Sequence, residues 1–253
     1  MPRASVSRPK LVLSCEHASA AVPLDLAALF RGRRKLLSTH RGYDIGALGV
    51  AQGIARRLAV PLVRGGSTRL IVDLNRSPRS RSLFSEFTRD LPRAERDALI
   101  ARFHSPHWAR AERMIDAAGA PVVHVAVHSF TPVLNGEVRR VDLGLLYDPA
   151  RPRERAFADA LHVAIARRAP ALRIRRNAPY HGRSDCLPTA LRKARPAADY
   201  LGFELELNQA MLRTRRDERE WAALLAPSLA EALAEAGASR ARRAPSAGGT
   251  RRR

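Results

Sequence analysis

Three short apolar runs in this chain each end on polar residues of the kinds that perform chemistry. The runs are 11–17 (LVLSCEH), 122–129 (VVHVAVHS) and 203–208 (FELELN). Apolar runs of this length are typical of buried strands in a parallel sheet. Because ligands gather outside the carboxyl ends of such strands, we expect His17, His128 and Glu206 to converge on one site although they lie far apart in the sequence.

The rest of the chain alternates between predicted strands and predicted helices. Short β-rich runs bounded by Gly and Pro predict strands at 61–63, 70–72, 143–147, 172–175 and 200–207. Apolar residues at helical spacing predict helices at 44–58, 94–118 with a break near Pro106, 154–168 and 218–236. This alternation predicts an α/β fold with a mixed, mostly parallel central sheet flanked by helices.

Size and composition predict a single domain over residues 1–238. The chain has 253 residues, of which 45% are hydrophobic, so it can bury a substantial core. Residues 239–253 are rich in arginine and contain almost nothing to bury, so they are predicted to form a disordered tail. The alternative is a basic arm that binds nucleic acid or a membrane surface.

The same composition predicts a cytoplasmic location and no membrane partner. No run approaches the roughly 18 apolar residues of a membrane span, and residues 1–5 do not open the apolar core of a signal peptide. Two cysteines, Cys15 and Cys186, are too few for a disulfide framework.

A formal net charge of +21 would ordinarily favour nucleic-acid binding, because dense Lys and Arg neutralise phosphates. Here the excess is almost all arginine, scattered over presumptive helix faces as well as clustered after residue 238. Aromatic residues make up only 5%, and neither a base-stacking motif nor a zinc-finger spacing is present. We therefore expect no specific nucleic-acid partner.

Two imidazoles and a carboxylate suit one catalytic zinc, which keeps a coordination position open for water. His17 and His128 are the predicted imidazole ligands. The carboxylate is either Asp44, in a Gly-flanked turn where its other role would be a helix N-cap, or Glu16, which a continuing strand would point away from His17. His124 lies on the His128 face but further into the sheet, so we assign it to structure.

Glu204 and Glu206 alternate with apolar residues and are expected to point to the same face of their strand. A buried carboxylate pair is costly unless it meets a site or solvent, so one of the two is the predicted general base. An edge strand with a wet face is the alternative. Cys15 is interpreted as a small buried residue rather than a nucleophile, because sequence adjacency to His17 does not create a thiol–imidazole hydrogen bond.

Residues 68–78 (TRLIVDLNRSP) carry candidate substrate-binding residues at a predicted strand end. The planar guanidinium groups of Arg69 and Arg76 suit bidentate capture of a substrate carboxylate, and Asn75 can orient an amide. The alternative for Arg76 is an ion pair with Asp73 or another acidic neighbour that shapes the loop.

Several segments, taken in order along the chain, form a recognisable set. They are Ser14-Cys15-Glu16-His17-Ala18-Ser19 followed by Val22-Pro23, the Gly42-Tyr43-Asp44 turn, 69–76 with its Val-Asp-Leu-Asn-Arg core, Val127-His128-Ser129, and 205–209 (LELNQ). This set resembles the N-formylglutamate amidohydrolase family from about residue 10 to about residue 215. The resemblance implies a phosphorylase/hydrolase-type fold, similar to that of the zinc carboxypeptidases and aspartoacylase-like deacylases, with one zinc per chain.

The resemblance also implies roles for individual residues. His17, Asp44 and His128 would bind the zinc, and Glu206 would be the general base. Arg69, Asn75 and Arg76 would hold the carboxylate and amide groups of the substrate, with Arg69 also serving catalysis.

The chain departs from the family pattern at two places. Family members that use N-formylglutamate tend to carry Pro-His-Ser-Gly at the first ligand and Asp-Thr-Asp-Trp near the second. This chain has Glu16-His17-Ala18-Ser19 and Gly42-Tyr43-Asp44-Ile45 instead. We therefore predict a divergent branch that retains zinc-dependent hydrolysis.

The predicted function is that of a zinc-dependent amidohydrolase in amino-acid degradation. It would cleave the N-acyl amide of a small anionic amino acid such as N-formylglutamate and release formate and the free amino acid. Two alternatives stay open at this point. One is a zinc carboxypeptidase or deacylase for another N-acyl amino acid or peptide, and the other is a basic interaction protein on an inactive hydrolase scaffold.

Overall fold

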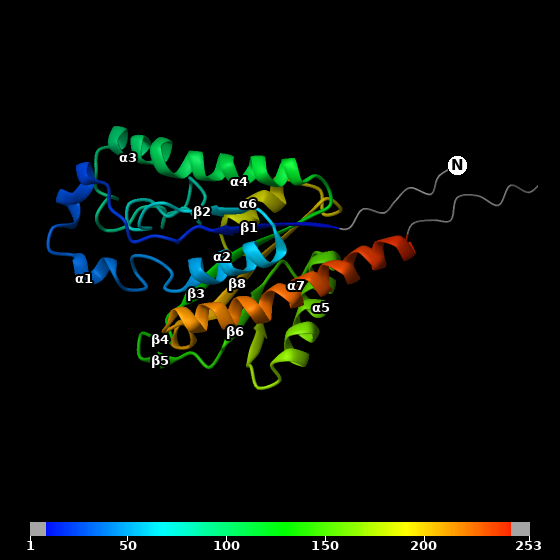
Figure 1. Cartoon of the computed structure of the whole chain (residues 1–253). Coiled ribbons are helices and arrows are strands. Elements are labelled where there is room, and N and C mark those ends of the chain that lie inside the picture. Colours follow the sequence, from blue (N-terminus) through cyan, green and yellow to red (C-terminus); the bar gives the residue numbers. More distant parts are fainter. Residues whose placement is uncertain (1–8, 244–253) are drawn as a thin grey trace, which may run out of the picture.

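The computed structural model describes residues 9–243 and centres on a six-stranded sheet in the order β2-β1-β3-β8-β6-β7 (Figure 1). The strands are β1 (Lys10–Cys15), β2 (Leu62–Arg64), β3 (Val122–Phe130), β6 (Leu143–Leu146), β7 (Ile174–Arg176) and β8 (Tyr200–Asn208). Strands β2, β1, β3 and β8 are mutually parallel, whereas β6 is antiparallel to β8 and parallel to β7. The predicted α/β class with a mixed, mostly parallel sheet is confirmed.

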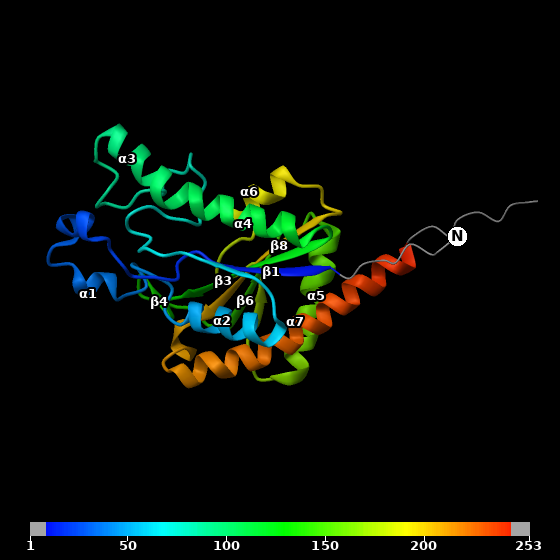
Figure 2. The same ribbon diagram turned by 45° about the horizontal axis from the view of Figure 1, so that its top comes forward.

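Helices cover both faces of the sheet, which explains why its central strands are buried throughout. Helices α2 (Ala47–Leu58), α5 (Pro152–Arg168) and α7 (Arg215–Arg243) pack on one face, and α4 (Ser105–Ala118) and α6 (Leu187–Ala194) on the other (Figures 1 and 2). All nine residues of β3 and of β8 are buried. Strands buried on both faces usually carry nearly continuous apolar runs, so the buried polar residues toward the carboxyl ends of β3 and β8 are exceptions that need partners or a site.

Part of the chain between β1 and β3 forms a smaller layer beside the sheet. It contains the 3-10 helix η1 (Leu24–Phe30), α1 (Arg34–Leu37) and α3 (Arg93–Leu99). Its side chains form a separate apolar cluster around Phe30, Ile71 and Leu83. The strand predicted at 70–72 is wrong, because this segment is a buried turn. Local hydrogen bonds replace a strand partner there: Ile71 N donates to Thr68 O, and Thr88 Oγ1 donates to Ile71 O.

Three predicted helix boundaries also differ from the structure. Helix α2 begins at Ala47 after Gly46, whose φ of +78° lies in the left-handed region, so Asp44 does not cap it. The interruption predicted near Pro106 is a π-helical turn, η2 (Ile100–His104), and not a loop. This turn joins α3 to α4, and the proline lies in the first turn of α4 directly after it. Helix α7 continues to Arg243, so residues 239–243 of the predicted tail are helical, and 244–253 lie outside the described residues.

The remaining elements are small. The hairpin β4 (Val133–Leu134) and β5 (Glu137–Val138) and the 3-10 turn η3 (Gln209–Met211) were not predicted. Strands β2, β6, β7 and β8 and helix α5 lie within about two residues of their predicted bounds. Among the described residues, no helix combines the length and the apolar character that a membrane crossing requires.

Candidate metal centre and active site

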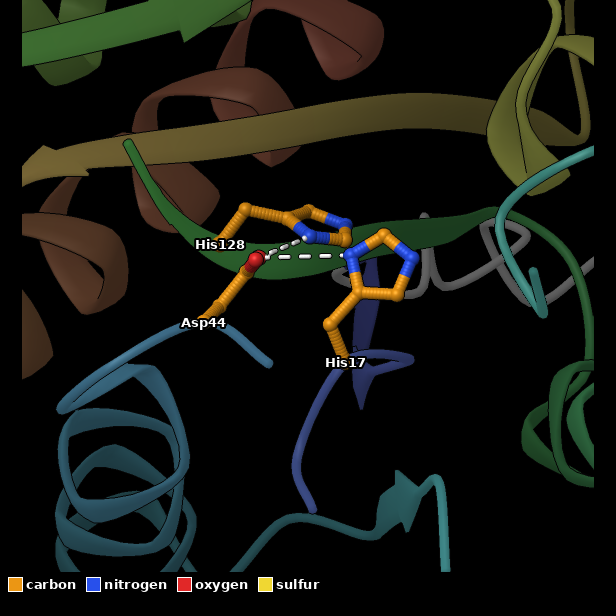
Figure 3. Close-up of side chains that lie close together, drawn as sticks. All are labelled: His17, Asp44 and His128. Atoms are coloured by element: carbon orange, nitrogen blue, oxygen red, sulfur yellow. Dashed lines mark hydrogen bonds and ion pairs between the residues drawn. The ribbon is translucent and has the colours of Figure 1, made fainter. Parts of the chain in front are cut away.

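Three buried side chains from separate elements meet beside the carboxyl end of the central strands (Figure 3). His17 follows β1, Asp44 precedes α2, and His128 belongs to β3. One ligand atom from each lies within 4.8 Å of the others. Asp44 Oδ2 is 2.8 Å from His128 Nδ1 and 3.4 Å from His17 Nδ1. The three residues expected to bind a metal are therefore brought together.

Backbone contacts explain why Asp44 points into the sheet. Asp44 N donates to His17 O at 2.9 Å, which fixes the Asp44 turn against the end of β1. Gly42 allows this close packing, because a Cβ there would lie 2.1 Å from Leu37 O. The Asp44 carboxylate also accepts from Ser129 N at 3.3 Å. The alternative role of Asp44 as a helix N-cap is therefore wrong.

The outer nitrogen of each histidine faces a second carboxylate. His17 Nε2 lies 2.7 Å from Asp73 Oδ1, and His128 Nε2 lies 3.0 Å from Glu16 Oε2. Metal-binding histidines usually present one nitrogen to the ion while a carboxylate or carbonyl orients the other. Glu16 thus lies behind His128, outside the cluster of candidate ligands, and the choice between Glu16 and Asp44 favours Asp44.

The electrostatics of the cluster suit a cation. Burial alone would raise the pKa of Asp44, but the charges and hydrogen bonds of His17 and His128 outweigh it and hold that pKa below its usual range. An ionised carboxylate and two imidazoles are the donor types that zinc prefers.

The cluster opens into a cavity of about 170 Å³. Glu204 and Glu206 both line it, as their alternation predicted. Strand β8 lies between β3 and β6, so the alternative of an edge strand with a wet face is wrong. Glu206 pairs in register with His128 of β3 and with Gly144 of β6.

The two glutamates differ in what they contact. Glu204 Oε1 accepts a hydrogen bond from Asn75 Nδ2 at 2.9 Å. Glu206 Oε2 has no hydrogen-bond partner among the described residues. Burial raises the pKa of Glu206 to about 8; the charge of His128 opposes this shift, and Asp44 and Glu204 add to it. A cation at the three ligands would favour the charged form. Glu206 is thus the carboxylate left available for a reacting group.

Two of the three predicted substrate-binding residues, Arg69 and Asn75, are held by side chains and backbone of the protein itself. Arg69 is engaged by protein, because its Nη2 and Nε donate to Asp73 Oδ2 at 2.7 and 3.2 Å. Asn75 is engaged on both sides, since its Oδ1 accepts from Leu187 N at 3.0 Å while its amide holds Glu204.

Arg76 differs from both. Its Nη1 donates to the backbone oxygens of Asn75 and Asp185, at 3.1 and 2.7 Å. No ion pair of Arg76 occurs among the described residues, so the alternative in which it pairs with Asp73 is not found. The Arg76 side chain lines the cavity and can accept an anionic partner.

Two residues interpreted as structural are placed as expected. His124 Nε2 lies 2.8 Å from Ser14 Oγ, and its Nδ1 lies 2.8 Å from Tyr200 OH. Burial lowers the pKa of His124 to about 4, so the ring is neutral at physiological pH. Cys15 is fully buried, and burial raises its thiol pKa well above the ordinary value. Such a thiol is not activated as a nucleophile.

One part of the cavity wall escaped the sequence analysis. The loop between β7 and α6 contributes Tyr180, His181, Ser184 and Cys186. The position of this loop could not be predicted from strand ends, because β7 runs antiparallel to β8 and its carboxyl end lies at the opposite edge of the sheet from the site. A histidine beside glycine in Tyr180-His181-Gly182 was the only local signal.

Fold and site together define a class: an α/β protein with a two-histidine, one-aspartate cluster and a free glutamate beside it. The N-formylglutamate amidohydrolase family matches residues 9–213, and the chain belongs to this family of amidohydrolases. The crystal structure of gene product Atu2144 from Agrobacterium tumefaciens is similar, with 31% sequence identity, a TM-score of 0.78, and coverage of 91% of this chain and 93% of that chain. The comparison with curated proteins gave no match.

Proposed function

We propose that this protein is a zinc-dependent amidohydrolase that removes the formyl group from an N-formyl acidic amino acid such as N-formylglutamate. One observation carries the proposal: the unpartnered Glu206 carboxylate and the His17–Asp44–His128 cluster share one cavity. The family supports amide hydrolysis. The location is proposed to be cytoplasmic, which the two free cysteines support.

The residues present fit a single zinc ion. His17, Asp44 and His128 would hold it, and Asp73 and Glu16 would orient the two imidazoles. Zinc bound there supplies a Lewis acid that polarises the amide carbonyl and acidifies water.

Glu206 would carry the proton through the reaction. It takes a proton from the attacking water as the oxygen–carbon bond forms, and it delivers that proton to the amide nitrogen as the carbon–nitrogen bond breaks. The other hydrogen of the water leaves on formic acid, whose proton passes to the amine, so the products are formate and the ammonium form of the amino acid, and atoms and charge balance. Arg69, held beside Asp44 and Asp73, places a positive charge next to the reacting carbonyl, where negative charge develops on oxygen.

Metal removal tests the proposal. The protein as purified is expected to contain about one zinc per chain and to release formate from N-formylglutamate. Chelation should abolish the activity and added zinc should restore it, with zinc measured by elemental analysis and formate by a coupled assay. Full activity in protein shown to be metal-free would contradict zinc dependence. No hydrolysis of any N-acyl amino acid or peptide by zinc-loaded protein would favour the alternative of an inactive scaffold.

Arg76 is expected to bind the carboxylate next to the scissile amide. N-formylglutamate should exceed N-formylisoglutamine, its α-carboxamide, in kcat/KM by roughly ten- to a hundredfold, because a charge-assisted bidentate pair contributes about 1.5–3 kcal/mol. Arg76→Ala should remove most of that preference and leave zinc bound. Arg76→Lys should restore little, because a point charge does not reproduce the planar fork.

The matched control for Arg76 is Arg79→Ala, since Arg79 is exposed a few residues away. It should keep the wild-type preference. Equal efficiency on acid and carboxamide in the wild-type enzyme would remove the role given to Arg76.

A further inference from the structure

Arg139 is a half-buried arginine that contacts Tyr180 of the cavity wall, and it has no carboxylate partner among the described residues. It follows the β4–β5 hairpin. Its guanidinium carbon lies 5.1 Å from the ring centre of Tyr180 and 5.7 Å from that of Phe130, and its Nη1 donates to Tyr180 OH at 2.8 Å. Tyr180 lines the cavity. The aromatic rings hold the guanidinium in place without neutralising its charge.

Backbone hydrogen bonds fix the position of Arg139 along the sheet relative to His128 and Glu206. Arg139 O accepts a hydrogen bond from Asn208 Nδ2 at 3.3 Å, and Arg139 N donates to Pro132 O at 2.8 Å. Asn208 ends β8 and pairs in register with Phe130 of β3. That pair lies two residues past the pair of His128 and Glu206 on both strands, which is about 7 Å along the sheet.

Arg139 is one of three arginines whose positive charges act on His40. Burial, followed by the charges of Arg41, Arg69 and Arg139, lowers the pKa of His40 below its ordinary value. Arg41 pairs with Glu86, and Arg69 pairs with Asp73. Arg139 is therefore the member of this group whose charge no described carboxylate balances.

We propose that Arg139 binds the side-chain carboxylate of the substrate and so selects N-acyl derivatives of dicarboxylic amino acids. The inference rests on the proposed function and deepens it. With the scissile amide at the metal cluster and Glu206, Arg76 takes the adjacent carboxylate. A glutamyl side chain then extends a carboxylate two methylene groups further, toward Arg139, whose charge no carboxylate of the described residues balances.

The test compares N-formylglutamate with N-formylglutamine, which differ only at the side-chain terminus. The wild-type enzyme should prefer the acid by roughly ten- to a hundredfold in kcat/KM, the range of a charge-assisted hydrogen bond. Arg139→Gln should lower kcat/KM for N-formylglutamate by that factor and leave N-formylglutamine nearly unchanged. Arg140→Gln is the matched control, because Arg140 is the exposed neighbour, and it should keep the preference.

The outcomes separate this inference from the function on which it rests. Retained activity on N-formylglutamine shows that Arg139→Gln is folded and loaded with metal. A wild-type enzyme that hydrolyses both substrates equally, or an Arg139→Gln variant that keeps the preference for acid, overturns the role of Arg139 and leaves the amidohydrolase proposal standing. Failure of the zinc-loaded wild type on both substrates overturns the amidohydrolase proposal itself.

Discussion

Glu206→Gln is expected to lower kcat by a factor of roughly 10²–10⁴, the usual contribution of a general base, while the protein keeps its zinc and its fold. Glutamine has nearly the same shape but cannot take the proton from water. The carboxylate is a candidate base because its Oε2 has no hydrogen-bond partner among the described residues and Glu206 lines the cavity together with the three candidate metal ligands. Steady-state kinetics, elemental analysis and circular dichroism measure the three quantities.

Glu204→Gln is the matched control, because Glu204 lies two residues earlier on the same face of β8 and lines the same cavity. Asn75 already donates to Glu204, and a glutamine oxygen can accept that bond equally well. We expect a loss at least tenfold smaller than that of Glu206→Gln. If the order of the two losses were reversed, Glu204 would be the base.

His128→Ala should abolish stoichiometric zinc binding and with it the turnover that depends on zinc. It removes one of the three proposed protein ligands. Even the loss of an outer partner that orients a ligand typically costs 10–100-fold in metal affinity. Zinc per chain after gel filtration in metal-free buffer gives the result directly.

His124→Ala provides the comparison on the same strand. Both histidines are buried in β3, but His124 contacts Ser14 and Tyr200 instead of the cluster. This variant should keep its zinc even where it lowers the thermal midpoint of unfolding. Near-stoichiometric zinc in folded His128→Ala would refute the assignment of ligands.

The sequence predicted the strands that build the site because those strands are buried on both faces. The sequence of β3 favours a buried strand because valine, a β-branched residue, makes up most of its apolar positions. His128 and Glu206 then follow from position at the strand end. The periodicity of β8 likewise placed Glu204 and Glu206 on one side.

Segments without a regular period were predicted less well. Ile71 and its neighbours are apolar because they pack against Phe30 and Leu83, and a short apolar run does not reveal whether a sheet or a turn buries it. The contacts of Asp73 with His17 and Arg69, and of Arg139 with Tyr180, join residues 4 to 56 positions apart through loops. No local pattern encodes such pairs.

The three candidate ligands come from chain segments that only the finished sheet brings together, since Asp44 is separated from His17 by 27 positions and from His128 by 84. An unfolded chain cannot hold these atoms within a few ångströms of one another, so the ion would bind the native state almost exclusively. Metal availability would then govern how much of this protein survives in the cell: a free zinc level 100 times the dissociation constant adds about 2.7 kcal/mol to the free energy of unfolding. Zinc starvation would shorten the lifetime of the protein as well as silence its catalysis.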